Sequence, residues 1–200
     1  MSNMDDALRL LKQEEAICRQ MKNLDGLQRN LGNQALIHRD TATKVLEELQ
    51  EFNTVAHNVR QFVSLDNALV QPFSILLSHH LENAIQLLQE QADLCGKLEK
   101  EADLLTSLGN QATALQLLGK FDESLLLHKE VAAMCRKSNN IQDLTVSLFN
   151  QAEILAFQMG KGREALPLAE EAHRLARESG LTALAQQVKP ILDEICAQAR

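Results

Sequence analysis

Apolar residues recur along this chain at helical spacing, and the pattern predicts helices from end to end. Leu104, Leu108 and Ala112 follow one another every four residues, which places them on one stripe of a helix. Alternating runs of Val, Ile and aromatic residues, which would indicate strands, are scarce. The chain also has only eight Gly and three Pro in 200 residues, so helix breakers are few. The sequence therefore predicts an all-α fold.

One short phrase recurs inside this helical pattern. It reads NLGNQA at 30–35, SLGNQA at 107–112 and SLFNQA at 147–152, and a worn copy reads SLDNA at 64–68. The Leu of the phrase stands at 31, 65, 108 and 148, so successive copies are 34, 43 and 40 residues apart. A period near 40 indicates a repeat protein.

A second phrase lies between the copies of the first. It reads DDALRLL at 5–11, ENAIQLL at 82–88, DESLLLH at 122–128 and REALPLA at 163–169, and each copy resembles the start of a helix. The repeating unit is therefore helix, turn, helix, turn, and such units stack into a solenoid. We expect one array over 1–200, with a half-repeat at 5–22, repeats at about 24–57, 59–98, 101–137 and 140–179, and a capping helix at 181–198.

Composition and charge narrow the possible partners. The formal net charge of -7 disfavours nucleic acid and anionic membrane surfaces, both of which attract clustered Lys and Arg. No segment is apolar enough to cross a bilayer, and the start lacks the features of a signal peptide, so we expect a cytoplasmic protein. Cys18, Cys95 and Cys135 share one slot of the repeat, where we expect reduced, packed thiols.

Catalytic and metal-binding patterns do not stand out in the sequence. It has no phosphate-binding loop, no Rossmann glycine pattern and no Cys with an assigned His base, so we expect no enzyme and no cofactor. His79 and His80, with His38 or His57, could be imagined as a metal site. Adjacent His residues point in different directions, so we favour a polar turn.

The first phrase and its surroundings resemble the tetratricopeptide-repeat family. Leu108-Gly109 followed by Gly119-Lys120-Phe121-Asp122-Glu123-Ser124 is similar to the family pattern. The units of about 40 residues are longer than the family's usual 34. The resemblance implies a right-handed superhelical solenoid of antiparallel helix pairs, which would bind a protein or peptide in its concave groove.

The same resemblance places the residue after Leu-Gly in that groove. The expected ladder of amides is Asn33, Asn67, Asn110 and Asn150. An amide can donate to and accept from the backbone of an extended peptide. The alternative is that these amides only brace neighbouring helices, which is also what we expect of Gln34, Gln111 and Gln151.

Further groove positions follow from the same frame. Four residues before each Asn stand Arg29, Val63, Thr106 and Val146; seven before stand Gly26, Arg60, Asp103 and Asp143; three beyond stand Leu36, Val70, Thr113 and Glu153. Such a groove is basic in its first two repeats and acidic in its last two, which would orient a ligand. The family's two-carboxylate clamp is not expected, because Asp103 and Ser107 stand where it needs basic residues.

The worn copy at 41–80 supports two interpretations. It has either decayed, or become a pocket or self-association surface with apolar residues on several sides, namely Phe62, Val63, Val70, Phe73 and Ile75. Pro72 is expected to break or kink its helix.

The array also opens on a half-repeat, which favours a fragment of a longer protein. We therefore expect a non-catalytic interaction scaffold, with a structural spacer or oligomerisation arm as the alternative.

Overall fold

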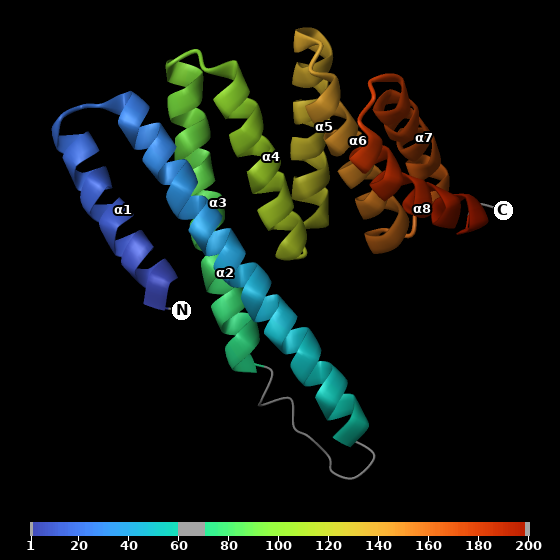
Figure 1. Cartoon of the computed structure of the whole chain (residues 1–200), viewed down its shortest axis with the longest axis horizontal. Helices are drawn as coiled ribbons and strands as arrows, with labels where there is room; N and C mark the ends of the chain where they lie inside the picture. Colours follow the sequence, from blue (N-terminus) through green and yellow to red (C-terminus); the bar gives the residue numbers. More distant parts are fainter. Residues whose placement is uncertain (1, 60–70, 199–200) are drawn as a thin grey trace. The chain divides into compact units, whose positions relative to one another are not determined.

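The computed structural model describes residues 2–59 and 71–198, and within these ranges every regular element is a helix. The helices are α1 Ser2–Gln20, α2 Leu24–Val59, α3 Gln71–Lys97, α4 Glu101–Leu117, α5 Phe121–Ser138, α6 Ile141–Glu153, the π-helix η2 Ile154–Gln158, α7 Gly162–Glu178 and α8 Thr182–Gln198 (Figure 1). The predicted all-α class is confirmed for this part of the chain.

The helices fall into two compact units, Met1–Ser107 and Leu108–Arg200, whose boundary lies within α4. In the first unit α2 packs against α1 on one side and α3 on the other (Figure 1). In the second, α5 packs against α6, α6 against α7 and α7 against α8. Each unit therefore consists of consecutive helices packed side by side, and the continuous array over 1–200 stays a prediction.

Three of the short turns share one backbone conformation. Lys22, Glu99 and Asn139 have φ values of 53°, 55° and 55°, in the left-handed region that closes a helix. In each turn the following N–H, that of Asn23, Lys100 or Asn140, donates at 2.9 Å to the carbonyl oxygen of Cys18, Cys95 or Cys135. The cysteine slot therefore marks the last turn of each second helix, and its three side chains are buried, as predicted.

The structure differs from the sequence prediction between 24 and 98. Two units with inner turns were expected there, whereas α2 runs unbroken from Leu24 to Val59 and pairs with the long α3. The reason is visible at Ala42, which stands where the later repeat has Gly119. Gly119 ends α4 with a φ of 79°, a conformation that Ala rarely adopts, so the helix continues through Ala42. The worn copy is thus, in its described part, an extension of one helix pair.

All three prolines lie within helices, Pro72 in α3, Pro167 in α7 and Pro190 in α8. Pro72 occupies the first turn of α3, where a missing N–H costs no hydrogen bond. The helix predicted to break there holds Asn67, which lies outside the described residues, as does Arg60. Pro190 was expected to kink or limit the closing helix, and α8 continues through it to Gln198. The predicted capping helix at 181–198 is therefore present.

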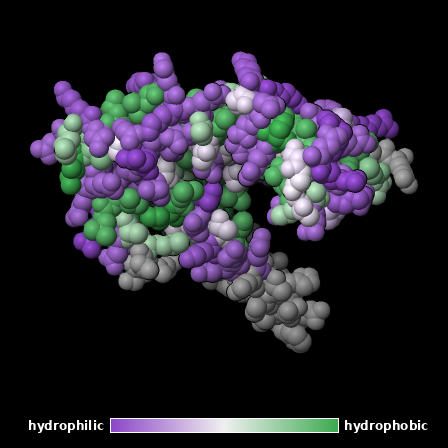
Figure 2. Space-filling view, turned by 45° about the horizontal axis from the view of Figure 1, so that its top comes forward, coloured by the Kyte–Doolittle hydropathy of each residue, from purple (hydrophilic) through white to green (hydrophobic). Residues whose placement is uncertain are grey.

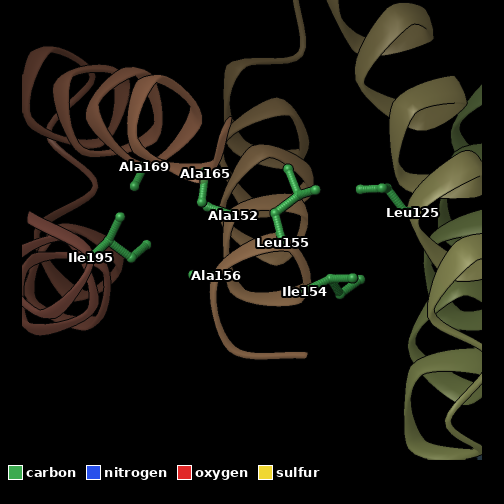
Figure 3. Close-up of a cluster of buried hydrophobic side chains, with 8 residues drawn as sticks. All are labelled: Leu125, Ala152, Ile154, Leu155, Ala156, Ala165, Ala169 and Ile195. Atoms are coloured by element: carbon green, nitrogen blue, oxygen red, sulfur yellow. The ribbon is translucent and has the colours of Figure 1, made fainter. Parts of the chain in front are cut away.

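The core of the second unit contains small residues where helices approach each other. Ala165 and Ala169 of α7 lie in one cluster with Ala152 of α6 and Leu155 of η2, and Ile195 of α8 lies beside them (Figure 3). All five side chains are at most 5% exposed. Because Ala needs little space, α7 lies close to both α6 and α8. The core of this unit is therefore held together by close packing of many side chains rather than by one large side chain.

Candidate partner-binding surface

The first letter of the repeated phrase makes the same hydrogen bond in all three described copies. Asn30 Nδ2 donates to the carbonyl oxygen of Leu11 at 2.9 Å, Ser107 Oγ to that of Leu88 at 2.7 Å, and Ser147 Oγ to that of His128 at 2.5 Å. The acceptor lies nineteen residues earlier each time. The donors are at most 2% exposed, so these bonds join the phrase to the preceding helix out of contact with water.

Three other positions of the phrase are also directed inward. Its Leu and its Ala are buried in every described copy, and so is its Gln. Gln34 Nε2 donates to Glu15 Oε2 of α1 at 2.7 Å, and Gln151 Nε2 donates to the His128 carbonyl oxygen at 3.2 Å. In these two repeats the Gln braces the adjacent helix, as expected.

The Asn of the phrase is the position that faces outward. Asn33 is exposed, and Asn110 and Asn150 are half-buried. None of the three is among the buried polar residues that join the helices. The position four residues earlier is more open still, since Arg29, Thr106 and Val146 are exposed. On each of α2, α4 and α6 the two positions lie one turn apart, and we call these positions together the Asn face: Arg29 and Asn33, Thr106 and Asn110, and Val146 and Asn150.

The Asn face of the first unit carries an ordered network of charges. Arg29 Nη2 lies 3.1 Å from Asp25 Oδ2, and the other oxygen of Asp25 accepts from Lys100 Nζ. Lys100 Nζ is also 3.8 Å from Asp103 Oδ2, which accepts from Gln28 Nε2 at 3.3 Å. The hydrogen bond from Lys100 is the main reason that the pKa of Asp25 lies below its usual value. The starts of α2 and α4 are thereby linked.

This network changes the expected charge pattern. Arg29 and Asp103 were assigned to a basic and an acidic end of the groove, whereas in the structure both belong to one chain of alternating charges. Asp25 and Lys100 were not predicted as site residues, although each stands beside the first residue of a helix, where turns bring charges together. Thr106, one turn beyond Asp103, donates to the Ala102 carbonyl oxygen at 3.0 Å within its own helix.

In the second unit the predicted acidic residues have different roles. Asn140 caps α6, since its side chain accepts from the backbone N–H of Asp143 at 3.2 Å and donates to Asp143 Oδ2 at 2.7 Å. Asp143 therefore contributes to the helix start. Glu153, at the other end of α6, is half-buried, and no described Lys or Arg forms an ion pair with it. Burial raises the pKa of its carboxyl above the usual value.

Glu153 also borders an irregularity of the backbone. The π-helix η2 begins at the next residue, Ile154, and ends at Gln158. Such widened turns are often found at functional positions because they shift the side chains that follow. Here Ile154, Leu155 and Ala156 all remain buried, so the widened turn keeps the core packed at the end of the helix.

The polar turn expected at His79 and His80 is wrong, because both residues lie within α3. His38 Nδ1 and His80 Nδ1 are 2.9 Å apart, so one ring donates to the other across α2 and α3. Burial, and to a lesser degree His80, lowers the pKa of His38 to about 4. Within the described ranges no group of three or more His, Cys, Asp or Glu side chains could hold a metal ion.

His128 has no such partner. It is 2% exposed, and neither ring nitrogen has a hydrogen-bond partner in the described structure. Burial lowers its pKa to about 4, so the ring is neutral at physiological pH. His128 is the last letter of the second phrase, where the other copies have Leu11, Leu88 and Ala169. The side chain therefore fills an apolar core position.

Comparison with known proteins supports the family resemblance over part of the chain. Residues 104–143 match the tetratricopeptide-repeat family model. No curated protein sequence matches the chain. A crystal structure of a 14-3-3 protein from Cryptosporidium parvum is similar, with a TM-score of 0.56 and 12% sequence identity over 86% of each chain. At that identity the likeness shows a common helical fold.

Among the described helices none has both the length and the apolar character that spanning a membrane requires. The matched segment 104–143 contains α4, α5 and the start of α6 with the two turns between them. These are the elements on which the family resemblance was recognised in the sequence, so that resemblance is confirmed for residues 104–143, which are similar to a tetratricopeptide repeat.

Proposed function

We propose that this chain is a non-catalytic scaffold that binds a peptide or a helical segment of a partner protein along the Asn face. One observation carries the proposal. Within the repeated phrase the first letter, the Leu, the Gln and the Ala are buried, whereas the Asn is not. The buried letters have structural roles, and the recurrence of an amide that stays at least partly open to solvent favours peptide recognition.

The charges of the Asn face favour a particular orientation of the partner. Asp103 already lies beside Lys100 and accepts from Gln28, and Asp143 accepts from Asn140, so both carboxylates already have partners within the chain. Glu153 is half-buried without a cationic partner among the described residues. A Lys or Arg of the ligand would therefore gain most beside Glu153, with its backbone amides near Asn150.

We do not propose that the chain binds its partner through the family's two-carboxylate clamp, because the position of Ser107 does not allow it. Ser107, one of the positions that would need a basic residue, is fully buried and bonded to Leu88. Placement in the cytoplasm and the absence of nucleic-acid and membrane partners belong to the same proposal. So do Asn67 and Arg60, whose positions lie outside the described residues.

Affinity capture with matched variants tests the proposal. The chain would be compared with a triple variant, Asn33→Ala, Asn110→Ala and Asn150→Ala, and with Leu126→Ala as a control on an exposed residue of α5 that lies outside the Asn face. We expect the triple variant to lose a captured protein that the control retains, with both melting like the parent chain. Retention of every captured protein by the triple variant would place the binding site elsewhere.

The alternative function, an oligomerisation arm, is also favoured by an observation of its own. Ile75 and Leu76, at the start of α3, are 68% and 38% exposed. They lie in the described part of the 41–80 region, for which self-association was predicted, whereas Phe62, Val63 and Val70 of the same region lie outside the described structure. Self-association through 41–80 therefore stays a prediction.

A further inference from the structure

A row of apolar side chains is exposed along α1. Leu10 is 58% exposed, Ile17 is 55% exposed and Met21, directly after the helix, is 71% exposed. Their spacing of seven and four residues places them on one side of the helix. Figure 2 shows that hydrophobic residues are exposed between hydrophilic ones on the face that it draws. Large apolar residues in a row, rather than scattered singly, indicate a surface that another helix covers.

The equivalent row on α3 shows what kind of helix covers it. The second phrase starts at residue 5 in α1 and at residue 82 in α3, so Leu10 and Ile17 correspond to Leu87 and Leu94. Leu94 is only 7% exposed and clusters with Leu27 and Leu31 of α2, with Leu87 packed against the cluster. The covering element is therefore a first helix of this chain's own repeat.

The chain also carries a first helix whose corresponding side is open, namely α8. Val188 of α8 occupies the column of Leu31, so the α2 residues that meet α3, Gln28, Gly32 and Ala35, correspond to Ala185, Lys189 and Leu192. Lys189 is exposed, and Ala185 and Leu192 are half-buried. A hollow of about 630 Å³ adjoins them, and its lining includes Ala185, Lys189, Ala176 and Arg177.

We infer that α1 of one copy of this chain packs against α8 of a second copy and completes a repeat between the two molecules. The two surfaces match, because α1 is a second helix with an uncovered apolar row and α8 is a first helix with an open side next to a hollow. Leu10 would then lie against Leu192, as Leu87 lies beside Ala35, and Ile17 would lie against Leu184, as Leu94 lies against Leu27.

Charge favours the same pairing. A Cβ at Gly32 would come within 2.5 Å of Gln91 Nε2, so these two positions face each other closely in the α2–α3 pair. In the frame of the repeat, Lys189 takes the place of Gly32, and Glu14, whose Oε2 accepts from Asn30 Nδ2 of α2 at 2.9 Å, takes the place of Gln91. The proposed contact therefore places an ammonium group opposite a carboxylate, where the internal pair has a glycine and an amide.

This contact joins two different surfaces, so each copy retains one free surface of each kind. Such head-to-tail association adds further copies unless the rotation between them closes a ring. It therefore predicts a mass that keeps rising with concentration beyond that of a dimer. An isologous contact, with the same surface on both copies, would stop at two.

Sedimentation velocity on the full chain and on two variants tests the inference. One variant carries Leu10→Glu and Ile17→Glu on α1, and the other carries Ala185→Glu and Lys189→Glu on α8. We expect the parent chain to form dimers and larger species as its concentration rises, and each variant alone to remain monomeric. An equal mixture of the two variants retains one intact surface of each kind, so it should form a dimer and nothing larger.

Leu126→Glu, at an exposed residue of α5, serves as the matched control and should associate like the parent chain. Circular dichroism melts would establish that all variants fold. A parent chain that stays monomeric at every concentration overturns the inference. So does a mixture of the two variants that shows no dimer, or a variant that still dimerises alone with its fold intact.

Discussion

Ser147 Oγ and the carbonyl oxygen of His128 are 2.5 Å apart, in a hydrogen bond between α6 and α5 that water does not reach. The same oxygen also accepts from Gln151 at 3.2 Å. Two letters of one phrase thus converge on a single carbonyl near the middle of the preceding helix. The phrase recurs because each first helix is fixed to its predecessor in this way.

The corresponding bond of Ser107 can be removed by Ser107→Ala. The Leu88 carbonyl oxygen would lose its bond to the hydroxyl at a site that water cannot enter, so we expect the free energy of unfolding to fall by about 1–3 kcal/mol. Urea denaturation monitored by circular dichroism would measure the change. Thr106→Ala is the matched control, since Thr106 is exposed and bonds within its own helix. Its effect should stay within about 0.5 kcal/mol; equal losses in both variants would contradict the role of Ser107.

Replacing His128 with Leu, the residue at this position in two other copies, should stabilise the chain. The substitution removes two buried ring nitrogens that have no partner in the described structure, so we expect a gain of about 1–3 kcal/mol in the free energy of unfolding at pH 7. Urea denaturation would again provide the measurement. His173→Leu, on a partly exposed residue, is the control and should change little. A loss of stability in His128→Leu would show that the ring has polar contacts.

The pH dependence of stability provides a second test of His128. Its pKa is about 4 in the folded chain and near 6.5 when unfolded, so between these values the unfolded chain binds the extra proton. The stabilising contribution of neutral His128 is therefore fully present above pH 6.5. As the pH falls towards 4, the free energy of unfolding decreases by up to about 3 kcal/mol because of this residue. His128→Leu should show a shallower loss over the same range, and identical profiles would contradict the assignment.

Glu99 holds a left-handed conformation, with a φ of 55°, that suits glycine better. Glu99→Gly should relieve about 1 kcal/mol of backbone strain, and the added freedom of the unfolded chain should reduce the net gain to about 0.5 kcal/mol. Thermal unfolding would show a small rise in Tm. Gly180→Ala, at a φ of 71° in the turn before α8, should have the opposite sign. A lower Tm for Glu99→Gly would mean that the Glu99 side chain contributes more than its backbone costs.

Glu153→Gln should increase stability at neutral pH. Burial raises the pKa of this carboxyl, so the folded chain holds its proton to a higher pH than the unfolded chain does. The protonated Glu153 carboxyl therefore stabilises the folded chain only at low pH, and this stabilisation is lost as the pH rises through the pKa of the folded state. The amide of Gln stays neutral at every pH, so the variant does not lose this free energy. The gain over the parent chain should disappear below about pH 4. Glu130→Gln, on an exposed carboxylate of α5, should show no such gain.

The sequence predicted the elements whose signals are local. The helix starts near 122 and 163, the buried cysteine slot and the closing helix follow from periodicity and turn residues, whereas the start predicted at 82 lies inside α3. The unbroken α2 was missed because a period counted on Leu residues was extended across Ala42, where the glycine that ends the other first helix is absent.

The candidate surface could be predicted only in part. The outward position of Asn33 follows from its place in the helix, because its neighbours at 31, 34 and 35 are all buried. The link from Arg29 through Asp25 and Lys100 to Asp103 joins residues that are far apart in the sequence, and no periodic pattern announces it. His128 could have been noticed as the one polar letter in its column of Leu11, Leu88 and Ala169.

The constant nineteen-residue interval between Leu88 and Ser107, or between His128 and Ser147, bears on how the chain can change in length. One residue inserted within that interval would rotate the phrase by about 100° and direct its hydroxyl away from the carbonyl. The connection from a first helix to its second is under no such restriction, because its length already differs between repeats. It is a short turn at Gly119 after α4, whereas the corresponding positions of the earlier repeat, Ala42 and Leu81, are far apart in the sequence. New loops, tags or whole domains should therefore be tolerated on that side of the repeat, and the opposite turns should resist any insertion.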